Sequence, residues 1–178
     1  MPKRPPSNEK LSLREINELQ PSGFVSTFRD IFEHSSWVAE RAWESRPFQN
    51  REDLLSAMAN AVETAGRELR LQLMSSHPDL AGKTAQNGEL TANSMREQSG
   101  AGLDACSHEE LSRLQSLNSD YKRKFGFPFV LAVKDLDKKA ILEAFEERIG
   151  SSLEDEFQEN LRQITRIADF RLDQLVAD

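Results

Sequence analysis

Residues 107–126 read Ser-His-Glu-Glu-Leu-Ser-Arg-Leu-Gln-Ser-Leu-Asn-Ser-Asp-Tyr-Lys-Arg-Lys-Phe-Gly. Ser107 is followed three residues later by Glu110, which has the form of a capping box at the start of a helix. The residues that recur after it at helical spacing share one face: Leu111, Leu114, Asn118, Tyr121 and Phe125. Gly126 follows the last of them, where helices tend to stop. The stretch therefore predicts a complete helix that packs on a core.

The same kind of pattern recurs along the chain. Ser12 with Glu15 and Ser152 with Asp155 again pair a hydroxyl with an acid three residues later. Two more apolar stripes at helical spacing are Phe24, Phe28, Ile31 and Phe32, and Leu54, Met58, Ala61, Val62, Ala65 and Leu69. We interpret these stripes as core positions, and they predict an all-α fold.

Two stretches lack a helical pattern. Residues 75–93 contain a proline and two glycines, which favours long irregular turns. Phe127–Val133 is a short apolar run whose start is made extended by Pro128. Since the sequence offers it no partner strand, we expect a buried connector between helices. The prediction is a compact single-domain helical bundle with irregular loops.

Length and composition limit the function classes. The chain has 178 residues, the size of one domain, and we assign residues 11–178 to it and the polar, Pro-rich residues 1–10 to a flexible tail. No apolar run approaches the roughly 20 residues that cross a bilayer. The formal net charge of −7 argues against nucleic acid, whose phosphates need a basic face. We therefore expect neither a membrane nor nucleic acid as a partner.

Motifs for the common cofactors are missing. The sequence contains no Gly-rich phosphate or dinucleotide loop and no zinc-type Cys and His spacing. The histidines at 34, 77 and 108 are too far apart in sequence to form a local metal pair. The single cysteine, Cys106, excludes an internal disulfide, fits a reducing compartment, and is interpreted as a packing residue. We expect no cofactor and no metal.

His77 is the first candidate for chemistry. It precedes Pro78 in Ser-Ser-His-Pro-Asp-Leu-Ala-Gly-Lys, just after a predicted helix, and Pro78 stiffens the backbone there. Imidazole titrates near neutral pH, and loops on a rigid scaffold often carry catalytic groups. The alternative is a loop histidine that only makes local hydrogen bonds.

A second candidate is the segment around Ser94. If residues 94–101 are helical, Ser94, Glu97 and Gln98 project from one face. A hydroxyl, a carboxylate and an amide side by side would suit a ring rich in N–H and C=O groups. The alternative is that Ser94 and Glu97 form a capping box and Gln98 is solvated.

The last helix supplies a third candidate. Its apolar seam runs through Phe157, Leu161, Ile164, Ala168, Arg171 and Leu175. Arg171 therefore lies on a core-facing stripe, whereas Arg166 falls on the opposite face. A buried cation needs a carboxylate, carbonyls or a ligand, so a structural ion pair and a ligand role both remain open.

Together these segments resemble one family, the OHCU (2-oxo-4-hydroxy-4-carboxy-5-ureidoimidazoline) decarboxylases of urate degradation. The resemblance runs from Ile16 to Leu175, and its most specific parts are His77-Pro-Asp-Leu-Ala-Gly-Lys83 and Phe125-Gly-Phe-Pro-Phe-Val130. It also covers Ser94-x-x-Glu-Gln98 and Arg171-Leu172. The sequence departs from the family pattern at Ser36 and Cys106, and neither residue touches the expected site.

The resemblance implies an all-α homodimer that converts OHCU to (S)-allantoin and CO2 without a cofactor. It assigns acid and base chemistry to His77, with Glu97 as a second catalytic candidate. The residues that the resemblance implies as substrate contacts are Pro78, Ser94, Glu97, Gln98, Phe129, Val130, Leu131, Ala132, Val133 and Arg171. Within this set, the connector residues 129–133 would act through main-chain groups. The substrate's own C=O and C=N groups would accept the electron pair that is left when CO2 departs.

Two other functions remain open. A non-catalytic helical module that binds a ureide or a partner protein would differ by lacking turnover. A hydrolase or lyase acting on a related ureide would differ in its product. The C-terminus, Val-Ala-Asp178, lacks a peroxisomal signal, so a cytoplasmic location is expected.

Overall fold

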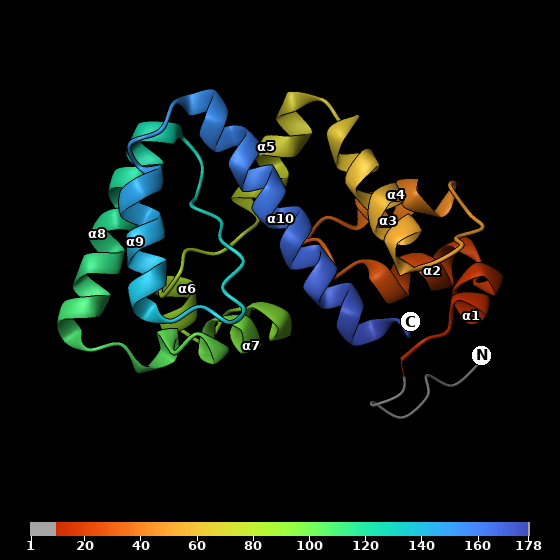
Figure 1. The fold of residues 1–178 in the computed structure, drawn as a ribbon, viewed down its shortest axis with the longest axis horizontal. Coiled ribbons are helices and arrows are strands. Elements are labelled where there is room, and N and C mark those ends of the chain that lie inside the picture. The colour runs from red at the N-terminus through yellow and green to blue at the C-terminus, as the bar shows by residue number, and fades with distance from the viewer. Residues whose placement is uncertain (1–9, 178) are drawn as a thin grey trace. The chain divides into compact units, whose positions relative to one another are not determined.

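The computed structural model describes residues 10–177, and it is all-α over that range (Figure 1). The helices in chain order are α1 (Leu13–Glu18), α2 (Pro21–Phe28), α3 (Ser36–Trp43), α4 (Arg51–Glu63), α5 (Arg67–Ser75), α6 (Lys83–Gln86), α7 (Ala92–Gly100), the 3-10 helix η1 (Leu103–Ala105), α8 (His108–Phe125), α9 (Lys138–Arg148) and α10 (Leu153–Leu175). Within residues 10–177 no β-strand is present, and an isolated bridge joins Leu11 to Val176. The prediction of an all-α fold is confirmed.

Two further sequence predictions concern the N-terminal tail and the absence of a membrane-spanning segment. Residues 1–9 of the expected tail lie outside the described residues. Among the residues that are described, no helix is long and apolar enough to cross a membrane.

The chain divides into two compact units. Among the described residues, the first unit comprises residues 10–65 and 167–177, and the second comprises residues 66–166. Helix α10 contributes its part up to Arg166 to the second unit and its part from Ile167 to the first. The expectation that residues 11–178 form one domain stays a prediction, and each unit is described by itself.

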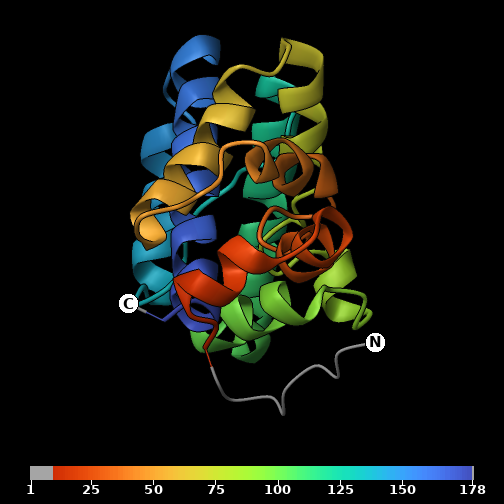
Figure 2. The same cartoon turned by 90° about the vertical axis from the view of Figure 1, so that its right-hand side faces the viewer.

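In the first unit α3 packs against α2 and α4, which can be followed in Figure 2. Phe24 is fully buried, and its ring lies 4.7 Å from that of Phe28 and 6.0 Å from that of Phe48. The predicted helical stripe was wrong in one respect, because α2 ends at Phe28. Ile31 and Phe32 are buried from the turn that follows, so core burial extends beyond the helix.

The stripe predicted from Leu54 to Leu69 is interrupted. Helix α4 ends at Glu63, and α5 begins at Arg67 with Gly66 as its extended N-cap residue. The two helices keep the same apolar rhythm although the chain turns between them, which is why periodicity alone could not show the break. The boundary between the two units falls at this same glycine.

The second unit is built around α8, which has the predicted bounds. Both capping-box hydrogen bonds between Ser107 and Glu110 are present, and Gly126 ends the helix with φ of +80°. Tyr121 is completely buried, and its ring lies within 6.3 Å of four phenylalanine rings, those of Phe125, Phe127, Phe129 and Phe145. Helices α8 and α9 lie side by side (Figure 1).

The two irregular stretches are found where they were expected. Residues 76–91 contain only the four-residue helix α6 between α5 and α7. Residues 127–133 form a connector from α8 towards α9 that is neither helix nor strand, and every one of them except Leu131 is buried. The loop and the connector carry most of the candidate site residues.

Candidate active site

His77 lies just beyond the end of α5 and is 7% exposed. Its backbone N–H donates to the carbonyl of Met74, and its ring Nδ1 lies 2.9 Å from the carbonyl oxygen of Leu73. A carbonyl can only accept a hydrogen bond, so Nδ1 carries the hydrogen in this arrangement. In the neutral ring Nε2 is then the unprotonated nitrogen. The last turn of α5 therefore fixes both the orientation of the ring and its tautomer.

The loop after His77 is held by side chains from α7 and α8. Gln98 Oε1 accepts from the N–H of Ala81 at 2.9 Å, and its Nε2 lies 3.4 Å from the carbonyl oxygen of Asp79. Asn118 donates from Nδ2 to the carbonyl of Leu80 at 2.9 Å. These contacts satisfy main-chain groups that would otherwise be buried without a partner. They hold the His77 loop in one conformation.

The loop also depends on Gly82 and on an exposed ion pair. A Cβ atom at Gly82 would lie 2.6 Å from the Cβ of Asp79, closer than real Cβ contacts come. Lys122 of α8 donates to the carboxylate of Asp79 at 2.7 Å, with the lysine side chain 46% exposed. The steric limit at Gly82 explains the glycine of the His-Pro-Asp-Leu-Ala-Gly-Lys segment.

Helix α7 presents the predicted face. Ser94 and Gln98 are buried, Glu97 is half-buried and Arg96 is exposed, in agreement with the i, i+3, i+4 spacing. The N-cap residue is Thr91, whose side chain accepts from the N–H of Ser94 at 3.3 Å. The alternative that Ser94 caps the helix is therefore wrong. The amide of Gln98 is bound to the His77 loop, so the expectation that Gln98 also contacts a substrate stays a prediction.

The connector Phe129–Val133 is held from α9 and α10. Val130 donates its N–H to Asn160 Oδ1, and Ala132 donates its N–H to Gln163 Oε1, each at 3.0 Å. The carbonyl of Val130 accepts from Arg148 at 2.8 Å. The backbone that is expected to contact the substrate through its main-chain groups is therefore fixed by hydrogen bonds at several points.

Arg171 belongs to the first unit. It is 4% exposed, and its Nη1 lies 2.9 Å from Glu33 Oε2 and 3.2 and 3.4 Å from the carbonyl oxygens of Asp30 and Ile31. The buried cation is therefore compensated by a buried carboxylate and by carbonyls. Arg166 is exposed, as expected. The structural ion pair is confirmed, and a substrate contact by Arg171 stays a prediction.

The candidate residues fall into two groups. His77, Pro78, the α7 residues and the connector lie in the second unit, where hydrogen bonds join the His77 loop to α7 and α8. Arg171 and its partner Glu33 lie in the first unit.

Sequence reasoning missed the residues that hold the loop and connector. Asn118 was placed on an apolar stripe, and a polar residue on such a stripe is a signal that could have marked it. Asn160 and Gln163 lie along α10 among its apolar positions, but nothing local in the sequence shows which backbone groups they meet.

Among residues 10–177, no three or more His, Cys, Asp and Glu side chains gather in a group that could hold a metal ion. Partial burial raises the pKa of the Cys106 thiol above its ordinary value, which disfavours the reactive thiolate. This agrees with the interpretation of Cys106 as a packing residue.

Residues 17–173 match the family described as OHCU decarboxylase, which is nearly the whole chain. The chain belongs to the OHCU decarboxylase family. The 2-oxo-4-hydroxy-4-carboxy-5-ureidoimidazoline decarboxylase of Haloferax volcanii is 46% identical over 163 residues, covering 92% of this chain and 95% of the relative. The uric acid degradation bifunctional protein PucL of Bacillus subtilis is 39% identical, and the match covers 94% of this chain and 33% of that protein.

Two solved structures share the fold of this family member. The structure of (S)-allantoin synthase superposes with a TM-score of 0.75 and 27% identity, over 93% of this chain and 54% of that one. The structure of OHCU decarboxylase in the presence of (S)-allantoin superposes with a TM-score of 0.66 and 23% identity, over 81% of this chain and 93% of that one. The resemblance inferred from the sequence motifs is confirmed.

Proposed function

We propose that this chain decarboxylates OHCU to (S)-allantoin and CO2 in urate degradation, with His77 as the acid and base group. The observation that carries the assignment of His77 is its hydrogen bond from Nδ1 to the Leu73 carbonyl. That bond leaves Nε2 as the nitrogen that exchanges a proton. Membership of the family and 46% identity to a relative named for this reaction support the substrate.

The reaction needs one bond to break and one proton to be delivered. In OHCU, as its name states, a hydroxyl and a carboxyl share one ring carbon, and the ureido group is on the next. When the bond to the carboxylate breaks and CO2 leaves, its electron pair forms a C=C bond to the ureido-bearing carbon. The electrons of the neighbouring C=N move to its nitrogen, which takes up a proton, and the product of this step is an enol. The enol hydroxyl then loses its proton and becomes the product C=O as the ureido-bearing carbon gains a proton, so the carboxylate form of the substrate takes up one proton overall. A protonated Nε2 of His77 in a fixed position delivers that proton to one face.

The α7 face and the connector supply groups that match the substrate. A ring carrying a ureido group presents N–H donors and C=O acceptors along its edges. Glu97 offers a carboxylate to N–H groups, and Ser94 offers a hydroxyl that can donate or accept. The main chain of the connector offers both N–H and C=O. Interactions with the ring nitrogen, on which negative charge develops as CO2 leaves, would strengthen as the reaction proceeds, which raises the rate of the chemical step.

Arg171 contributes to this function in one of two ways. The Arg171–Glu33 pair is buried, and the Glu33 carboxylate fixes the orientation of the guanidinium. We assign Arg171 to a ring or ureido oxygen of the substrate. Binding the departing carboxylate would stabilise the ground state as well and would not accelerate the chemical step.

The test uses purified protein and freshly generated OHCU. We expect OHCU to decay faster than it does in buffer, with (S)-allantoin accumulating as an optically active product. The decay of substrate absorbance measures the rate of OHCU loss, and circular dichroism of the product measures its handedness. Decay at the buffer rate together with a racemic product would contradict the proposal, and tight binding without turnover would favour the non-catalytic module. A different product would favour a hydrolase or another lyase.

The assembly and location of the protein belong to the same proposal. The family resemblance implies a homodimer, which light scattering on the purified chain would detect as twice the 20.2 kDa mass of one copy. A cytoplasmic location is the corresponding expectation for the cell, and fractionation would test it.

A further inference from the structure

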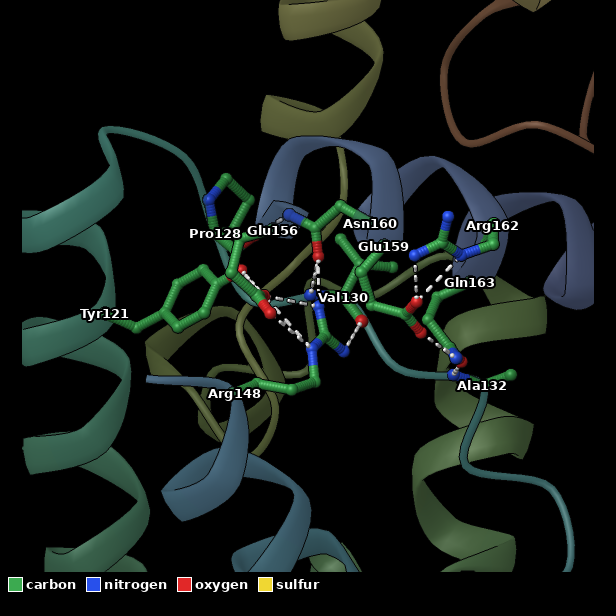
Figure 3. Close-up of polar contacts among 10 residues, drawn as sticks. All are labelled: Tyr121, Pro128, Val130, Ala132, Arg148, Glu156, Glu159, Asn160, Arg162 and Gln163. Carbon is green, nitrogen blue, oxygen red and sulfur yellow. Dashed lines mark hydrogen bonds and ion pairs between the residues drawn. The ribbon is translucent and has the colours of Figure 1, made fainter. Parts of the chain in front are cut away.

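The connector is bound along one edge in the manner of a β-strand. Asn160 Nδ2 donates to the carbonyl of Pro128 at 2.9 Å, and Asn160 Oδ1 accepts from Val130. Gln163 Oε1 accepts from Ala132, two residues further along. Figure 3 shows both α10 side chains pointing at these main-chain groups. Residues 128, 130 and 132 therefore face the α9 and α10 side chains, in the two-residue alternation of extended backbone.

The same alternation turns residues 129 and 131 to the opposite edge. Phe129 anchors the segment by its side chain, which stacks on Phe145 with ring centroids 3.7 Å apart. Leu131 is half-buried, and within the described part of the chain its main-chain N–H and C=O make no hydrogen bond. The connector thus presents an adjacent donor and acceptor from one residue, which matches the paired N–H and C=O of a ureide or cyclic amide.

A buried network fixes the orientation of Asn160. Arg148 Nη2 donates to Asn160 Oδ1 at 2.8 Å, and Arg148 also pairs with Glu156 at 2.9 Å (Figure 3). Glu156 in turn accepts from the hydroxyl of Tyr121 at 2.5 Å. Since Arg148 and Val130 both donate towards Oδ1 while Pro128 offers only an acceptor, one orientation of the Asn160 amide satisfies all three. Asn160 itself is completely buried.

We propose that Asn160 and Gln163 are positioning residues for the decarboxylation, because they fix one edge of the connector and thereby present the N–H and C=O of Leu131 to the substrate. The inference rests on the proposed function, in which the connector contacts OHCU. A binding group held through its backbone works only if that backbone keeps its place, and small displacements from a productive geometry are costly in rate.

Gln163 offers the sharper test because α10 contains a matched control. Gln163 donates from Nε2 to Glu159 at 2.8 Å, and Gln158 donates from Nε2 to Glu154 at 2.9 Å. Only Gln163 also accepts from Ala132. Gln163→Leu and Gln158→Leu therefore remove the same contact within the helix, and differ in the contact to the connector.

The expected result is a loss of turnover confined to one variant. We expect Gln163→Leu to lower kcat by about tenfold with a smaller change in KM. Gln158→Leu should remain close to wild type, and the two variants should unfold at similar denaturant concentrations. Amide hydrogen exchange at Ala132 should accelerate only in Gln163→Leu. The double substitution Glu159→Gln with Gln163→Glu exchanges donor and acceptor but keeps an acceptor for Ala132, so it should restore most of kcat.

Three outcomes would overturn the inference. Equal kcat in the two leucine variants, with wild-type turnover intact, would overturn it while leaving the proposed function standing. A lowered kcat that the double substitution fails to restore would mean that Gln163 acts by some route other than Ala132. Absence of turnover in the wild-type chain would overturn the proposed function and this inference together. Asn160→Leu, assayed only if it folds, should lower kcat at least as much as Gln163→Leu.

Discussion

The hydrogen bond from Nδ1 of His77 to the Leu73 carbonyl leaves Nε2 as the unprotonated nitrogen of the neutral ring. The sequence marked this residue through its loop and the following proline, but a lone loop histidine has an equally simple structural interpretation. The contact with Leu73 was not predictable, because it depends on where α5 ends and on the side-chain torsions that follow. Gln98 is a similar case. Its face was predicted correctly from helical spacing, whereas its partners Ala81 and Asp79 come from a loop that has no periodicity.

His77→Asn should abolish most of the decarboxylation. Loss of an acid and base group typically costs about 10²–10⁴-fold in kcat, and the helical circular-dichroism spectrum should be retained. Initial rates with freshly made OHCU measure the effect. His108→Asn is the control, since His108 is exposed at the start of α8, and it should leave the rate unchanged. Near-normal turnover in a folded His77→Asn variant would remove His77 from the mechanism.

Arg171→Met should destabilise the fold. It leaves the Glu33 carboxylate, 3% exposed, without its cation, and such losses cost about 3–5 kcal/mol. Arg166→Met, at an exposed position, should change the free energy of unfolding little. Urea denaturation followed by circular dichroism measures both. Adding Glu33→Gln to Arg171→Met should recover part of the lost free energy of unfolding, because it removes the unpaired buried carboxylate. If nothing were recovered, the loss in Arg171→Met would not come from breaking the pair with Glu33.

At the scale of one element, predictability followed the strength of the local signals. Helix α8 was predicted with its two ends because a capping box and a terminal glycine enclose an unbroken stripe. The stripe from Leu54 to Leu69 was read as continuous because nothing in its apolar rhythm marks the turn at Gly66. The connector was predicted to be buried and to start in an extended conformation at Pro128, but its partners on α9 and α10 are long-range and leave no local pattern.

Helix α7 allows a test between neighbouring residues. Glu97→Gln should lower kcat/KM by about 10–100-fold, the worth of a hydrogen bond to a charged group, because Glu97 shares a face with Ser94 and Gln98. Arg96→Gln should be close to wild type, since Arg96 is exposed and donates to Asn93 across the helix surface. Steady-state kinetics on OHCU compare the two. If both variants lost activity equally, the α7 face would not be the surface that meets the substrate.

Over the whole molecule, composition and periodicity predicted the helical class, and the motifs predicted the family. The division at Gly66 was not predicted, because it depends on the density of contacts within each unit and not on any linker composition. The motif that names the family lies in the second unit, whereas Arg171 lies in the first. A family motif can therefore predict that residues share a function without indicating which structural unit holds each of them.

The stability of the fold should fall in alkali because of Tyr121. Burial, and then the hydrogen bond to Glu156, raise the pKa of Tyr121 well above the ordinary value of about 10. The folded state thus holds the proton that the unfolded state releases, so this contribution to stability is complete below about pH 10 and is lost as pH rises beyond it. Tyr121 is the single tyrosine in the chain, so near-ultraviolet absorbance of tyrosinate reports on it alone.

The measurement compares native and unfolded protein in one titration. Unfolded protein in concentrated urea should ionise its tyrosine near pH 10. Native protein should show no tyrosinate signal there, and the signal should appear at higher pH together with loss of helical circular dichroism. Ionisation of native Tyr121 at the same pH as the unfolded chain, with the helices intact, would show that its hydroxyl is not held as the hydrogen bond to Glu156 requires.

The last prediction concerns the source of the electron sink and of the proton. The sequence contains no motif for a phosphate-bearing cofactor and no zinc spacing, and the substrate's own C=N can accept the electron pair released with CO2. Activity should therefore survive exhaustive dialysis against EDTA. In D2O the product should be (S)-allantoin with one deuterium on its stereogenic carbon, because the His77 ring exchanges its acidic proton with solvent and delivers it from a fixed position. Mass spectrometry and circular dichroism of early product measure the isotope and the handedness.

A racemic, deuterated product from the first turnovers would mean that the enol leaves before His77 protonates it. Activity lost in EDTA and restored by one particular metal would contradict the mechanism more deeply, since the proton donor would then have to be sought among water bound to that metal.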